Sequence, residues 1–183
     1  MHFLFRYSGL LTIVIAWILL VLPYLLLKKK QYRVSWISNI VLLGSPYSWI
    51  IAVGVISASI TQIAFALYIL SKFPSFWGSI AAAVFSLGAF CFLLSGTIAE
   101  TSSVKVHGFF IKTYILLMTT GALLFMISFI LIKLPMAIIV TTPVIVWIIG
   151  AVYFYSRDKW DVTELWIIFF SSVWVVMLYL FIL

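Results

Sequence analysis

Long apolar runs, separated by short polar segments, make up most of this chain. Six runs are long enough to cross a bilayer, since a membrane helix needs about 20 apolar residues. They cover residues 8–27, 48–70, 79–98, 109–132, 136–155 and 163–183. The runs are continuously apolar and lack the alternation of polarity that is typical of a membrane β-strand. The pattern therefore predicts an all-α polytopic membrane protein, a bundle of six transmembrane helices.

The polar segments predict how these helices are connected. The second and fourth connections are very short, so we expect helices two and three, and helices four and five, to form antiparallel hairpins. Residues 34–46 are amphipathic and too short to span, which predicts one short interfacial helix that ends at Gly44 and Pro46. We expect residues 1–183 to form a single transmembrane domain.

The composition excludes a water-soluble domain. The chain is 66% hydrophobic and 8% charged, and a globule of this size has too little interior to hide that much apolar surface. We therefore expect an integral protein of the cell membrane. Its partners would be membrane lipids and other membrane protein subunits rather than nucleic acid, in spite of the net charge of +7.

The basic residues predict the orientation in the membrane. Eight lie near the odd-numbered connections: Lys28, Lys29, Lys30, Arg33, Lys105, Lys112, Arg157 and Lys159. The other three, Arg6, Lys72 and Lys133, lie near the N-terminus and the even-numbered connections. Cytoplasmic loops carry an excess of Lys and Arg. The odd-numbered connections are therefore predicted to be cytoplasmic, with both termini outside.

The odd-numbered connections also carry the candidate site residues. Glu100 and His107 lie together in the third connection, and Arg157 lies in the fifth. We predict a polar binding face that includes these three residues with Gly44 and Gly96, and we expect Glu100 and His107 to pair across their connection. The chain has only two histidines, on opposite faces, and one cysteine in the middle of a span. We therefore predict neither a metal site nor a cofactor.

Three further polar residues lie inside the spans. Gln62 must find a partner in hydrocarbon, which either an interhelical hydrogen bond or a ligand contact would supply. Thr141 and Thr142 precede Pro143, which removes a backbone hydrogen bond and kinks the helix. We expect the two threonine hydroxyls to satisfy the freed carbonyls. Such a kink can also shape a cavity.

The last span begins with a polar sequence that is typical of a capped helix. Asp161 or Thr163 is predicted as the N-cap, with Glu164 in the first turn, where a carboxylate favours the helix dipole. This assignment leaves the spans without an acidic residue at membrane depth. Ion pumps and proton-coupled carriers normally need one, so the pattern argues against both.

Two stretches resemble a known family. They are "LLGSPYSWIIAVGVI" before and within the second span, and "SGTIAE" six residues ahead of "HG" at the fourth. Together they resemble a family of uncharacterised prokaryotic six-helix membrane proteins, similar to the Frag/DRAM/Sfk group of eukaryotic multispan proteins. The resemblance carries over Gly44, Gly96, Glu100 and His107, while Leu42 stands where the family has an acid. Some relatives in that group act in lipid organisation or autophagy-linked signalling.

Three classes of function stay open at this stage. The chain shows no catalytic motif, which favours a non-enzymatic protein that binds lipid or serves as an accessory or structural subunit of a membrane complex. One alternative is a transporter component that captures a small molecule. Another is a membrane-embedded enzyme that modifies lipid.

Overall fold

The helical elements of this protein are taken from a computed structural model that describes residues 2–29, 48–98, 104–134, 136–157 and 159–183. In chain order they are α1 (His2–Arg6), α2 (Ser8–Ile15), the π-helix η1 (Ala16–Val21), α3 (Leu22–Lys29), α4 (Ser48–Lys72), α5 (Phe76–Ile98), α6 (Val104–Leu131), α7 (Ala137–Tyr155) and α8 (Trp160–Phe181). Six stretches within them are long and apolar enough to cross a membrane. The predicted all-α fold with six transmembrane helices is confirmed, and the chain is an integral membrane protein. The predicted interfacial helix at residues 34–46 lies outside the described residues.

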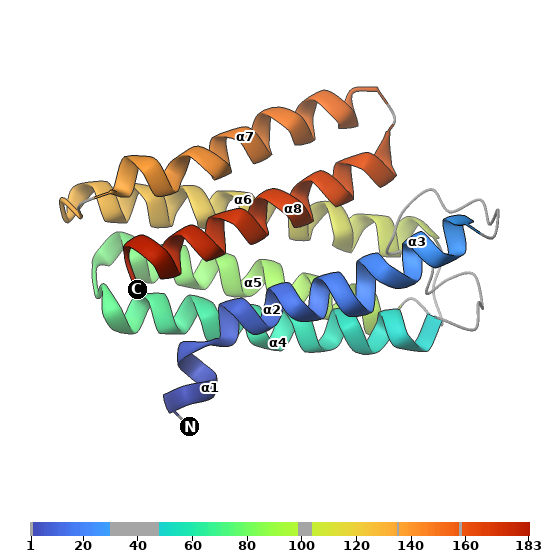
Figure 1. Cartoon of the computed structure of the whole chain (residues 1–183), viewed down its shortest axis with the longest axis horizontal. Helices are drawn as coiled ribbons and strands as arrows, with labels where there is room; N and C mark the ends of the chain where they lie inside the picture. The colour runs from blue at the N-terminus through green and yellow to red at the C-terminus, as the bar shows by residue number, and fades with distance from the viewer. Residues whose placement is uncertain (1, 30–47, 99–103, 135, 158) are drawn as a thin grey trace.

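The spans run alternately in opposite directions (Figure 1). The α4–α5 and α6–α7 connections lie at one end of the bundle with the C-terminus, and the starts of α4, α6 and α8 lie at the other end. Spans that are consecutive in the chain pack against each other, and α2 also packs against α8. The six spans therefore form a ring in chain order, which closes where the first span meets the last.

The first span is not a uniform α-helix. It consists of α2, η1 and α3, which together cover the candidate span Ser8–Leu27. At the end of η1 the backbone N–H of Leu22 donates to the carbonyl of Trp17, five residues earlier, which is the wider turn of a π-helix. An apolar run gives no sign of this turn, because α and π turns accept the same side chains.

Three helices begin earlier than the apolar pattern predicts. The largest difference is at α6, which starts at Val104 rather than at residue 109. Helix α8 starts at Trp160, and its N-cap is Lys159, without a side-chain cap hydrogen bond. Thr163 instead donates from inside the helix to the carbonyl of Lys159, at 2.8 Å. The predicted N-cap at Asp161 or Thr163 is wrong, because hydropathy detects where a helix enters hydrocarbon and not where its backbone becomes helical.

Small residues allow the spans to approach closely. A Cβ atom on Gly54 of α4 would lie 2.8 Å from the Cβ of Leu19 in η1. A Cβ atom on Gly121 of α6 would lie 2.9 Å from the backbone nitrogen of Phe85 in α5. Real Cβ atoms do not come this close, so these two contacts require glycine. The close approach of these helices therefore depends on small residues.

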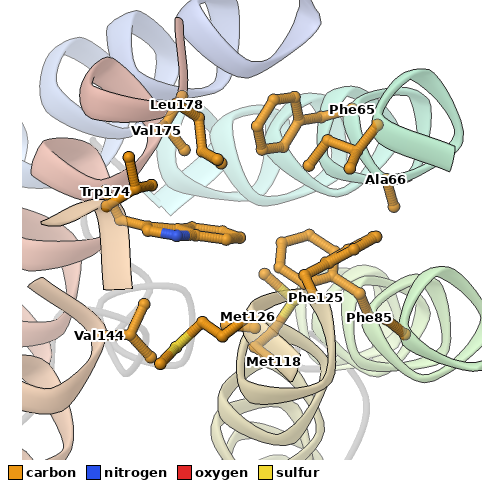
Figure 2. Packing of buried hydrophobic residues seen from close by; sticks show 14 of the residues in the cluster. Phe65, Ala66, Phe85, Met118, Phe125, Met126, Val144, Trp174, Val175 and Leu178 are labelled. Carbon is orange, nitrogen blue, oxygen red and sulfur yellow. The ribbon is translucent and has the colours of Figure 1, made fainter. Parts of the chain in front are cut away.

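Aromatic side chains fill much of the interior of the ring. Trp174 of α8 is 1% exposed, and its ring centroid lies 6.3 Å from that of Phe65 in α4 and 6.2 Å from that of Phe85 in α5. Figure 2 shows the indole reaching into the space between Phe65 on one side and Phe125 and Met126 on the other. Trp174 therefore links the last span to helices on the opposite side of the ring.

Candidate ligand-binding site

A cavity of about 90 Å³ lies inside the ring, and side chains from all six spans line it. Most of its wall is aliphatic or aromatic. The polar side chains on the wall are Thr12, Gln62, Tyr114, Glu164, Ser171 and Ser172. They come from the first, second, fourth and sixth spans, so the folded ring brings together residues that are far apart in the sequence.

Gln62 and Tyr114 form the central polar contact of the wall. Gln62 is 9% exposed, and its Nε2 donates a hydrogen bond to the Tyr114 hydroxyl at 3.2 Å. The Tyr114 ring stacks on Phe92, with 4.3 Å between centroids and 11° between planes. This stacking fixes the direction of the hydroxyl. The predicted interhelical hydrogen bond of Gln62 is confirmed.

Several buried polar atoms around the cavity lack a partner. Within the described part of the chain, Gln62 Oε1, Trp147 Nε1 and Trp174 Nε1 are buried without a hydrogen bond, and all three residues line the cavity. Nearly all buried polar groups in folded proteins are hydrogen-bonded. Three residues that carry such an unpaired atom therefore line the same cavity.

Glu164 departs from its predicted role. It lies within the candidate span Val162–Phe181, is 9% exposed and lines the cavity. It also interacts electrostatically with Tyr114. The prediction that no acidic residue lies within a span is therefore wrong for Glu164. Because α8 begins at Trp160, residue 164 lies a full turn inside the helix, and its side chain borders the interior.

His107 lies within α6 rather than before it. It is 3% exposed, and its Nδ1 lies 3.2 Å from the carbonyl oxygen of Ser95 in α5, which links the two helices. Its Nε2 is buried without a hydrogen-bond partner among the described residues. Glu100, the predicted partner, lies outside the described residues, so the pair stays a prediction.

The other members of the predicted polar face have separate surroundings. A Cβ atom on Gly96 would lie 2.7 Å from Cγ1 of Val55, so this glycine lets α5 pack on α4. Arg157 is exposed, with its guanidinium carbon 4.4 Å from the ring centroid of Tyr153. Gly44 lies outside the described residues. The face as a whole therefore stays a prediction.

The two threonines of α7 do not border the cavity, although Thr141 is buried. The hydroxyls of Thr141 and Thr142 both donate to the carbonyl of Ile138, at 2.5 and 3.3 Å. The carbonyl that loses its partner to Pro143 is that of residue 139, four positions earlier. The expectation that the threonines satisfy this carbonyl is therefore wrong, because their side chains reach the preceding turn one residue too early.

The sequence pattern missed Tyr114, Trp147 and Glu164 as wall residues. Only Glu164 carried a usable signal, since an acidic residue inside an apolar run is rare and points to a functional site. Aromatic residues are common in membrane helices, so their position in the run does not identify those that face a cavity. Among the described residues, no group of three or more His, Cys, Asp or Glu side chains is placed to hold a metal ion.

Comparisons with protein-family models, with curated proteins and with solved structures found no match. The family resemblance drawn from the two sequence stretches stays an expectation. Any function assigned to the chain therefore has to rest on the geometry of the bundle and its cavity.

Proposed function

We propose that this protein binds a small lipid-soluble molecule in the cavity inside its helix bundle, without catalysing a reaction. The observation that carries the proposal is the cavity itself, with a largely apolar wall built from all six spans. Both the lipid-binding class and the small-molecule-capture class need such a space. An accessory subunit that acts only through its surface does not.

A molecule bound in this space would be in contact with wall residues from all six spans. A molecule that fills the space restores the dispersion contacts that its wall lacks. Since the protein lies in a bilayer, apolar molecules are present around it at high concentration.

The volume limits the size of the ligand. An apolar cavity of about 150 Å³ accepts benzene. On the same scale, the present cavity of about 90 Å³ has room for a molecule of about four non-hydrogen atoms, or for one end of a longer molecule. The aromatic wall suits the apolar body of either.

Quenching of tryptophan fluorescence by 1-bromobutane tests the proposal in the full-length protein reconstituted in lipid bilayers. Trp49 and Trp77 are exposed, so their quenching should rise steadily with the amount of quencher in the bilayer. Trp147 and Trp174 line the cavity, so binding there should add a component that saturates.

A variant that fills the cavity provides the control. Ala58 lines the cavity and is 1% exposed, so Ala58→Leu should abolish the saturable component. Ala83 is exposed on α5, so the same change at Ala83 should leave that component intact. Absence of saturable quenching in the unmodified protein, or its persistence in Ala58→Leu, would refute the proposed function.

A further inference from the structure

The side-chain amide of Gln62 has a nitrogen and an oxygen, and only the nitrogen has a hydrogen-bond partner among the described residues. Its Nε2 donates to the Tyr114 hydroxyl, and its Oε1 is buried without a hydrogen bond. Turning the amide over would pair the oxygen with the hydroxyl and leave the nitrogen alone. Whichever way it lies, one end needs a further partner, and in a membrane interior water does not readily supply one.

The polar atoms around the cavity restrict what that partner can be. Gln62 Oε1 is an acceptor, the Trp147 and Trp174 indoles are N–H donors, and all three belong to residues that line the cavity. A purely apolar ligand would leave all of these groups unpaired. An ammonium group could donate to the amide oxygen and would lie near Glu164, but it has no lone pair with which to accept from Tyr114 or the indoles. An anionic group could not donate to the amide oxygen and would also face Glu164 on the same wall.

We infer that the ligand of this cavity carries a neutral group that both donates and accepts hydrogen bonds, such as a hydroxyl, and that this group binds at Gln62 and Tyr114. This inference rests on the proposed function. The ligand is then a small, mostly apolar alcohol, or the hydroxyl-bearing end of a longer lipid. Its apolar part lies against the aromatic side chains of the wall, among them Phe65 and Phe85.

Binding requires a small movement of the amide. The Gln62 oxygen is covered by neighbouring side chains in this structure, so a hydroxyl reaches it when the amide turns about its last torsion angle. That torsion is broad and soft, unlike the staggered torsions before it. The Tyr114 ring stays fixed by its stacking on Phe92.

A matched pair of probes tests the inference. 3-Bromo-1-propanol has the same number of non-hydrogen atoms as 1-bromobutane and carries a hydroxyl in place of the terminal methyl group. The saturable quenching should reach half its maximum at about a fivefold lower amount of the alcohol in the bilayer, the effect of about one net hydrogen bond. Gln62→Met, which keeps the side-chain length without the amide, should remove this preference.

Tyr114→Phe provides a second variant in case Gln62→Met does not fold, and it should also reduce the preference. Trp77→Phe, on the exposed surface, should leave it unchanged. Equal half-saturation by the two probes would overturn the inference while the proposed function stands, and so would a preference that persists in both cavity variants. Absence of saturable quenching by either probe would instead refute the proposed function.

Discussion

The hydrogen bond between Gln62 and Tyr114 should respond differently to the loss of its two partners. Removing the Tyr114 hydroxyl should lower stability more than removing the Gln62 amide. Tyr114→Phe removes the only hydrogen-bond partner of Gln62 among the described residues and leaves both ends of a buried amide unpaired. An interhelical hydrogen bond in a membrane contributes about 0.6 to 1.7 kcal/mol, and a newly unpaired buried group costs about 1 to 3 kcal/mol. We therefore expect Tyr114→Phe to lower the free energy of unfolding by about 1 to 2 kcal/mol.

Gln62→Met removes the same hydrogen bond, but its net effect on the free energy of unfolding should be smaller. It also removes Oε1, which is already buried without a partner in the unmodified protein. The penalty of that oxygen, about 1 to 3 kcal/mol, disappears together with the bond. Gln62→Met leaves the buried Tyr114 hydroxyl without its only hydrogen-bond partner among the described residues, so the relief offsets only part of the cost. We therefore expect a loss below about 1 kcal/mol, smaller than that of Tyr114→Phe. The double variant should cost less than either single change, because two apolar side chains then face each other and no polar group is left unpaired.

Unfolding by a denaturing detergent in mixed micelles, followed by circular dichroism, measures these differences. Tyr153→Phe is the control, because Tyr153 is exposed and loses a hydroxyl outside the interior. Its effect should stay within about 0.5 kcal/mol. If Gln62→Met costs as much as Tyr114→Phe, then the Gln62 oxygen has a partner in the folded protein and is not an unpaired end of the amide.

Two further predictions concern packing and orientation. Gly150→Ala should destabilise the protein by about 2 kcal/mol, because the new Cβ would lie 1.9 Å from Nε1 of Trp166. Gly108→Ala is the control and should leave stability unchanged or raised, since nothing lies within 4 Å of a Cβ there. Thermal unfolding measures both. If the odd-numbered connections are cytoplasmic, a membrane-impermeant thiol reagent applied outside should label a cysteine at Lys133 and not one at Lys159, both exposed. The reverse labelling would invert the orientation.

The number of spans could be predicted because bilayer thickness sets the length of an apolar run directly. Each of the six predicted runs overlaps one candidate span. The starts of α6 and α8 were predicted too late, because their first turns carry polar residues such as Lys105 and Thr163. These residues are compatible with a helix at the membrane surface, but they lower the apolar signal. The π-helix at Ala16–Val21 depends on backbone hydrogen bonds and has no counterpart in the hydropathy pattern.

The candidate site could be predicted only in part. Gln62 was recognised because an amide inside an apolar run has to find a partner. Its partner Tyr114 could not be recognised, since their contact depends on how α4 and α6 are placed and rotated around the ring. Glu164 was assigned to the helix dipole because the start of α8 was misjudged. The polar amide in an apolar run thus predicted that Gln62 needs a hydrogen-bond partner. Which residue that partner is depends on the packing of the helices.

The polar wall of the cavity is complete only when the ring is closed. Thr12 belongs to the first span, and Ser171 and Ser172 belong to the last. Among the described residues, a hydrogen bond joins these spans, from the Trp17 indole to the Ser172 hydroxyl at 3.2 Å. A second hydrogen bond joins α8 to α1, from the Tyr179 hydroxyl to the carbonyl of Arg6.

Closure of the ring therefore depends on contacts between the two ends of the chain, whereas the other spans pack against neighbours in sequence. A ligand that binds only the closed ring stabilises that ring by mass action. Under the proposed function, the contact between α2, η1 and α8 is thus the part of the fold that should gain most from an occupied cavity. A purely structural bundle would gain nothing there from any small molecule.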